Sequence, residues 1–176
     1  MEEEIEQLYL DHSDRVYRYI FLLIRQKENA EDLTQETFYK AFKNLKSFNH
    51  QSSVSTWLLK IARNVTYDFL RRKKMIRFFS MDNEEDHASS LPVLEEMVAQ
   101  KEQTSELYRA MKTLKKDYQE VLLLRKINEC SIKETAYILG WTEAKVKTKT
   151  SRALESLKKE LIGKDGGLHG SEQTTR

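Results

Sequence analysis

Residues 131–157 read SIKETAYILGWTEAKVKTKTSRALESL, and the pattern of this segment predicts the fold of the C-terminal half of the chain. Its first four residues, Ser131-Ile132-Lys133-Glu134, form a capping box, in which the serine hydroxyl and the glutamate each satisfy a backbone N–H at the start of a helix. The pattern predicts a short helix to Leu139, a turn at Gly140-Trp141-Thr142, and a longer basic helix. This succession is typical of a helix-turn-helix.

The second helix of this motif carries the side chains that can reach DNA. In a helix-turn-helix its N-terminal part enters the major groove, so its outward residues matter most. They are Glu143, Lys145, Lys147, Thr148, Lys149 and Arg152. Lysine and arginine donate to guanine or phosphate, and glutamate accepts from cytosine. The core positions are expected to be Ala136, Leu139, Val146 and Leu154. A plain helical hairpin with a solvated lysine face is the alternative.

Apolar residues recur every three or four positions in the N-terminal part, which predicts three amphipathic helices. The first covers about residues 3–26, the second is expected to start at a cap on Asn29, and the third continues into Arg71-Arg72-Lys73-Lys74. The buried stripe of the second is expected at Leu33, Thr37, Phe38, Ala41, Phe42 and Leu45. Three such helices can bury one another and form a first domain.

Residues 79–101 interrupt the helical pattern, accumulate acidic side chains, and hold Pro92, the one proline of the 176 residues. A structureless stretch of this length is uncommon inside a compact domain, so it is interpreted as a linker. The expected fold class is therefore all-α, with two small helical domains. The expected boundaries are a domain at 1–78, an acidic flexible linker at 79–101, a domain at 102–162, and a disordered tail at 163–176.

Composition argues against several classes of function. One cysteine excludes a disulfide framework, and four scattered histidines lack metal-ligand spacing. No Walker pattern for nucleotide hydrolysis is present. We expect no catalytic residue, no metal and no cofactor. The acidic start is unlike a signal peptide, and the longest apolar run, Tyr19 to Ile24, is far below a membrane span. We therefore expect a cytoplasmic protein without direct membrane insertion.

The net charge of +2 conceals two basic zones separated by an acidic one. Residues 57–78 carry seven basic and one acidic side chains, whereas residues 79–106 carry one and eight. The third predicted helix follows the loop Phe48-Asn49-His50 and carries the aromatic residues Trp57 and Tyr67. Its cationic and amide side chains are Lys60, Arg63, Asn64, Arg71 and Arg72. Cations beside aromatic rings suit a single strand whose bases have left the stack. The alternative is that Trp57 and Phe48 belong to the core.

The second predicted helix carries an acidic and amide face. Asp32, Gln35, Glu36 and Tyr39 lie within one or two turns of one another. No inward carboxylate or histidine partner accompanies them, so an acid-base or metal site is not indicated. The two remaining interpretations of this surface are a protein-docking face and a plain solvated face.

Three motifs, in this order, resemble the signatures of the extracytoplasmic-function sigma factors of bacterial RNA polymerase. They are Ala30-Glu31-Asp32-Leu33-x-Gln35-Glu36-x-Phe38, Ser55-Thr56-Trp57-Leu58-x-x-Ile61-Ala62-x-Asn64 and Val146-Lys147-Thr148-x-x-x-Arg152-Ala153-Leu154. The resemblance covers about residues 5–162. It implies a non-enzymatic initiation factor whose region 2 docks on the polymerase clamp and captures the melted non-template strand of the minus-10 element. Its region 4 would read the minus-35 duplex and dock on the flap.

The resemblance also implies the role of individual residues. Core polymerase contacts are implied at Asp32, Gln35, Glu36 and Phe38. Minus-10 contacts are implied at Asn49, Lys60, Arg63, Asn64 and Arg71, and minus-35 contacts at Lys145, Lys147, Thr148, Lys149 and Arg152. A membrane-anchored anti-sigma factor is an expected partner. The rival interpretations are a stand-alone helix-turn-helix regulator and a helical protein-interaction adaptor.

Overall fold

The computed structural model describes residues 2–80 and 102–165, and every regular element in these ranges is a helix. The N-terminal half holds α1 (Glu2–Ile24), α2 (Lys27–Asn44), the 3-10 helix η1 (Leu45–Ser47) and α3 (Val54–Ser80). The C-terminal half holds α5 (Glu102–Thr113), α6 (Lys116–Leu122), the π-helix η2 (Leu123–Ile127), α7 (Ile132–Leu139) and α8 (Glu143–Asp165). The all-α prediction is confirmed.

The predicted linker and tail fall largely outside the described residues. Positions 79–80 end α3, and residues 81–101 are not described. At the other end α8 continues to Asp165, so the helix covers the first three residues of the predicted tail. The backbone hydrogen bonds of α8 therefore persist into the glycine-containing sequence at Gly163, where the composition indicated an earlier end.

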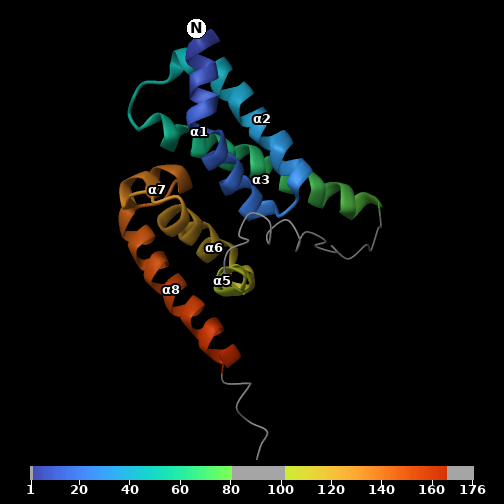
Figure 1. The fold of residues 1–176 in the computed structure, drawn as a ribbon, viewed down its shortest axis with the longest axis vertical. Coiled ribbons are helices and arrows are strands. Elements are labelled where there is room, and N and C mark those ends of the chain that lie inside the picture. Colours follow the sequence, from blue (N-terminus) through green and yellow to red (C-terminus); the bar gives the residue numbers. More distant parts are fainter. Residues whose placement is uncertain (1, 81–101, 166–176) are drawn as a thin grey trace, which may run out of the picture.

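Helices α1, α2 and α3 pack against one another in the N-terminal half (Figure 1). Their shared core contains fully buried side chains from each helix: Val16, Tyr19 and Ile20 from α1, Ala30 and Ala41 from α2, and Leu58, Leu59, Ala62 and Val65 from α3. The buried threonines Thr34, Thr37 and Thr66 donate to backbone carbonyls one turn earlier, at 2.7–2.8 Å, so burial leaves their hydroxyls satisfied. The prediction of three mutually buried helices is confirmed.

Two details of α2 were predicted wrongly. The helix begins at Lys27 after Gln26, so Asn29 lies in the first turn, where its amide donates to the Gln26 side chain at 2.6 Å. Arg25, at φ 55°, reverses the chain directly after α1 and thereby starts α2 earlier than the sequence pattern suggested. Phe42 is 45% exposed because it lies about 100° around the helix from the buried Ala41, at the edge of the stripe.

The helix-turn-helix forms as the sequence predicted. The Ser131 hydroxyl accepts from the N–H of Glu134 at 3.1 Å, and the Glu134 carboxylate accepts from the N–H of Ser131 at 2.7 Å. Gly140 ends α7 at φ 66°, ψ 34°, a left-handed conformation that glycine adopts without steric cost. Val146 is fully buried, as is Ala153. Leu154, expected in the core, is 39% exposed because its neighbour Ala153 takes the inward position.

The two halves of the molecule are packed together. Helix α3 lies against α7, and α1 lies against η2 (Figure 1). Buried apolar side chains of both halves belong to one continuous cluster. The sequence indicated two domains but contained no signal for this contact, which places parts of the two basic zones face to face.

The capping box can be tested by replacing Ser131 with alanine. Ser131→Ala removes the acceptor of the Glu134 N–H, and loss of such a cap costs about 1 kcal/mol. We expect the melting temperature, followed by circular dichroism, to fall by about 2–4 °C. Ser151→Ala, at an exposed interior position of α8, is the control and should not lower it. An equal melting temperature for Ser131→Ala and wild type would contradict the cap.

Candidate nucleic-acid and polymerase interfaces

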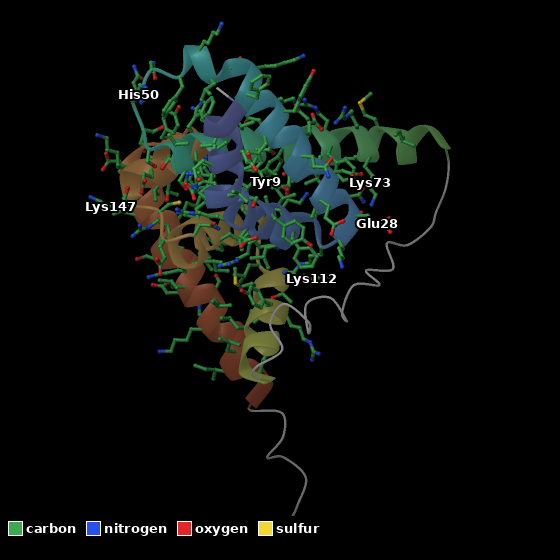
Figure 2. All side chains as sticks on the ribbon, turned by 45° about the horizontal axis from the view of Figure 1, so that its top comes forward. Tyr9, Glu28, His50, Lys73, Lys112 and Lys147 are labelled. Carbon is green, nitrogen blue, oxygen red and sulfur yellow. The ribbon has the colours of Figure 1, made fainter. Side chains whose placement is uncertain are left out.

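The N-terminal part of α8 presents a basic outer face. Lys145, Lys147, Thr148 and Arg152 are exposed, as is Glu143. Figure 2 labels Lys147 at the outer edge of the molecule, on the side of α8 away from the core. Thr142 caps the helix by accepting from the N–H of Lys145 at 3.2 Å. The expected DNA-contacting residues of this helix are therefore accessible, except that Lys149 is partly covered.

Two lysines of this face are held by neighbouring side chains. The Lys145 ammonium lies 4.3 Å from the centroid of the Trp141 ring, a cation–π contact that orients it beside the turn. The Lys149 ammonium pairs with the Asp117 carboxylate of α6 at 2.9 Å. The hydrogen bond from Lys149 is the main reason that the pKa of Asp117 lies below its ordinary value. Lys149 thus links α8 to α6 through an ion pair, whereas Lys147 and Arg152 project from the exposed face of α8.

The loop before α3 presents Asn49 and His50 at the surface. Figure 2 labels His50 at this loop. The Phe48 ring lies 4.8 Å from the Trp57 ring and 4.6 Å from the His50 ring, measured between centroids. Trp57 and Phe48 are both half-buried, and Trp57 packs against the core. His50 adopts φ 55°, so the backbone turns sharply here and leaves Asn49 exposed at the tip.

The expected minus-10 residues of α3 divide between two faces. Asn64, Arg71 and Arg72 are exposed, and Arg71 pairs with Asp68 one turn away at 2.7 Å. Lys60 and Arg63 point instead at the C-terminal half. With Thr56 and Tyr67 they recur at intervals of four, three and four residues and so form one stripe of the helix, here called the α3 stripe.

A buried carboxylate from α6 faces the α3 stripe. Glu120 is 3% exposed, and its oxygens accept from Arg63 Nε at 2.6 Å, from the Tyr67 hydroxyl at 2.9 Å and from the Tyr19 hydroxyl at 3.0 Å. Burial and the nearby Glu120 charge raise the pKa of both tyrosines. Burial opposes the charge on Arg63, but its hydrogen bond and attraction to Glu120 outweigh that effect and raise its pKa. Arg63 and the two tyrosine hydroxyls therefore serve as the donors to the Glu120 carboxylate.

Further contacts join the two halves, two of them from the α3 stripe and one from α1. The Thr56 hydroxyl donates to the Glu134 carboxylate of the capping box at 2.7 Å. The Lys60 ammonium lies 3.8 Å from the centroid of the Tyr137 ring. On α1, Arg15 donates to the carbonyl of Asn128, just after η2. Glu120 and Tyr19 could not be predicted from the sequence as partners. A glutamate between Gln119 and Val121 and a tyrosine in an apolar stripe carry no signal that they meet in the fold.

The exposed face of α2 holds most of the residues expected to contact a protein partner. Asp32 and Gln35 are exposed, and the half-buried Glu36 pairs with Lys40 at 2.9 Å. Phe38 lies elsewhere, because it is only 7% exposed and packs edge-on against the Tyr9 ring at 4.9 Å. Tyr39, which is 57% exposed, occupies the outer face in its place. We call Asp32, Gln35, Glu36 and Tyr39 the α2 face.

Comparison with known proteins shows the family to which the chain belongs. The Sigma-70 region 2 profile matches residues 8–75, and that of Sigma-70, region 4 matches residues 104–157. The ECF RNA polymerase sigma factor SigX of Bacillus subtilis is 34% identical over 92% of this chain and 85% of its own length. The chain belongs to the ECF sigma factors. It is an RNA polymerase sigma factor that directs transcription initiation and is not an enzyme, which decides against the stand-alone regulator and the adaptor.

Two solved structures share the fold of this sigma factor. The sigma factor RpoE of Bartonella quintana, solved with the anti-sigma factor NepR, superimposes with a TM-score of 0.73 at 23% identity, covering 91% of this chain and 98% of that one. CnrH, solved with the cytosolic domain of CnrY, gives a TM-score of 0.70 at 20% identity over 93% and 90%. In the described parts of this sigma factor, no helix is long and apolar enough to cross a membrane.

Proposed function

We propose that three surfaces of this sigma factor divide the work of initiation. The exposed face of α8 binds the minus-35 duplex, the Asn49 loop and α3 hold the melted minus-10 strand, and the α2 face docks on the clamp of core polymerase. Region 4 also docks on the flap. The observation that carries the proposal is the outward, basic start of α8, set by the turn at Gly140.

The arrangement of α8 supports duplex reading. Val146 and Ala153 anchor one side of the helix in the core, so Lys147, Thr148 and Arg152 project from the other side. A helix that projects these side chains near its N-terminus fits the width of the major groove. Lys145 and Lys149, which are held by Trp141 and Asp117, fit contacts to phosphate better than the reading of a base edge.

The region 2 surface supports capture of a single strand. Asn49 at the loop tip offers donors and an acceptor to an unpaired base edge. Asn64, Arg71 and Arg72 are exposed along α3, where cations can follow a phosphate backbone. Lys60 and Arg63 belong to the same proposed surface, although here both contact region 4.

The α2 face suits a basic protein partner. Its carboxylates and amide surround Tyr39, an exposed aromatic side chain that carries the Lys43 ammonium 4.4 Å from its ring centroid. Charged groups around an aromatic residue are typical of an interface in which charge orients the partner and the ring supplies buried area. We also propose a cytoplasmic location and a membrane-anchored anti-sigma factor as partner. The anti-sigma factor NepR bound to RpoE, and the cytosolic domain of CnrY bound to CnrH, support a partner of this kind.

Recognition by α8 predicts different effects for two kinds of residue. Lys147→Ala or Arg152→Ala should cost about 1–3 kcal/mol of promoter binding and relax preference at one minus-35 position if the side chain reads a base. If it contacts phosphate, binding should weaken equally for all sequences. Holoenzyme binding to a set of minus-35 variants measures this. The control Lys158→Ala lies three turns farther along α8 and should change little, whereas wild-type binding by both test variants would contradict the assignment.

Docking through the α2 face predicts a loss of polymerase binding on charge reversal. Asp32→Arg combined with Glu36→Arg should abolish co-purification with core polymerase, because the reversed charges would repel a basic partner. The control, Asp11→Arg with Asp14→Arg on exposed positions of α1, makes the same change in net charge elsewhere in region 2. Co-purification of a folded α2 variant at the wild-type level would rule out this face.

Strand capture through the loop predicts a defect specific to melting. Asn49→Ala should lower permanganate reactivity of the minus-10 bases more than closed-complex formation, because strand contacts must offset an unstacking cost of a few kcal/mol. Asn44→Ala, at an exposed position near the end of α2, is the matched control. If Asn49→Ala reduced both stages equally, the loop would have no separate role in melting.

A further inference from the structure

One carboxylate of region 4 is bound by three donors of region 2. Glu120 belongs to α6, whereas Tyr19 belongs to α1 and Arg63 and Tyr67 belong to α3. Among the described residues, each side-chain donor with a hydrogen bond to Glu120 therefore comes from the other region. The carboxylate is 3% exposed, although its helix lies near the surface of region 4 and its neighbour Asp117 is exposed. The contact with region 2 is what buries it.

The composition of this contact allows the two regions to separate. A buried carboxylate is stable only while its hydrogen-bonding partners remain in place. On separation, water can solvate Glu120, Arg63 and the tyrosine hydroxyls, so neither region is left with an unpaired charge in an apolar interior. Interfaces between domains of one chain are more polar than permanent interfaces. The α3 stripe supplies such polar contacts beside the apolar cluster that the two halves share.

One of these donors, Arg63, also belongs to the surface proposed to capture the promoter strand. A carboxylate and a phosphate are both anionic acceptors, and arginine binds either through the same N–H groups. Arg63 Nε and the Tyr67 hydroxyl are already engaged by Glu120, at 2.6 and 2.9 Å. A strand phosphate could reach them only if α6 moved away.

We propose that Glu120 is an internal latch, which holds region 4 over the α3 stripe and competes with the phosphates of the single strand for Arg63 and Tyr67. The proposal rests on the proposed role of α3 in strand capture. The contacts of Lys60 with Tyr137 and of Thr56 with Glu134 close the rest of the stripe in the same way. Lys147 and Arg152 stay exposed in this closed form, so duplex reading remains possible while strand capture is blocked.

The test uses the full chain with Glu120→Gln, which keeps the side-chain volume but removes the charge that holds Arg63. Small-angle X-ray scattering reports the radius of gyration, and fluorescence anisotropy reports binding of a labelled oligothymidylate. If the closed form makes up about nine tenths of the free chain, opening should tighten binding about tenfold. Glu106→Gln, at an exposed position of region 4, makes the same change in charge and should leave both measurements at wild type.

Two further variants make the result specific. Tyr19→Phe removes one donor but keeps the ring in the core, so it should shift both measurements in the same direction by a smaller factor. Adding Arg63→Ala to Glu120→Gln should abolish the gain in affinity but keep the larger radius. Wild-type radius and affinity in folded Glu120→Gln, or in Tyr19→Phe if the first variant does not fold, would overturn the latch. A larger radius without tighter binding would instead contradict the assignment of α3 to strand capture.

Discussion

The hydrogen-bonded group around Glu120 sets the relation between the two halves of this sigma factor. It joins α6 to α1 and α3, and its acceptor and donors come from opposite sides of the contact. Removing one partner of a buried ion pair typically costs about 3–5 kcal/mol, because the other charge then lacks compensation. The contact is therefore cooperative, since its members are all paired in the closed molecule and can all be hydrated when the halves part.

Helix α3 serves the fold and the proposed function through different sides. Leu58, Ala62 and Val65 bind it to α1 and α2, and these positions give region 2 its core. The polar α3 stripe lies on another side, where the core places no demand on residue type. A stripe of this kind can bind either nucleic acid or a second domain, because both offer anions and aromatic surfaces to the same lysine and arginine side chains.

The helix-turn-helix shares one carboxylate with the domain contact. Glu134 closes the capping box of α7 and also accepts from Thr56 of α3. The backbone hydrogen bond from Ser131, and then that from Thr56, hold the pKa of Glu134 below its ordinary value. A carboxylate with a depressed pKa contributes stability above its unfolded pKa and loses it as the pH falls through the folded value. Acid should therefore weaken the α7 cap and this domain contact together.

The helices, the helix-turn-helix and the family could be predicted from the sequence, because these depend on local patterns: apolar spacing, the capping box at Ser131 and the glycine at 140. The sequence also indicated candidate surfaces on three helices, α2, α3 and α8, whose roles remain proposals. It could not place Phe42 or Leu154, because a position at the edge of a stripe is buried or exposed according to its neighbours. The pairing of Arg63 with Glu120 could not be predicted, because the two residues are 57 positions apart in the sequence. They meet only because of the way whole helices pack in the tertiary structure.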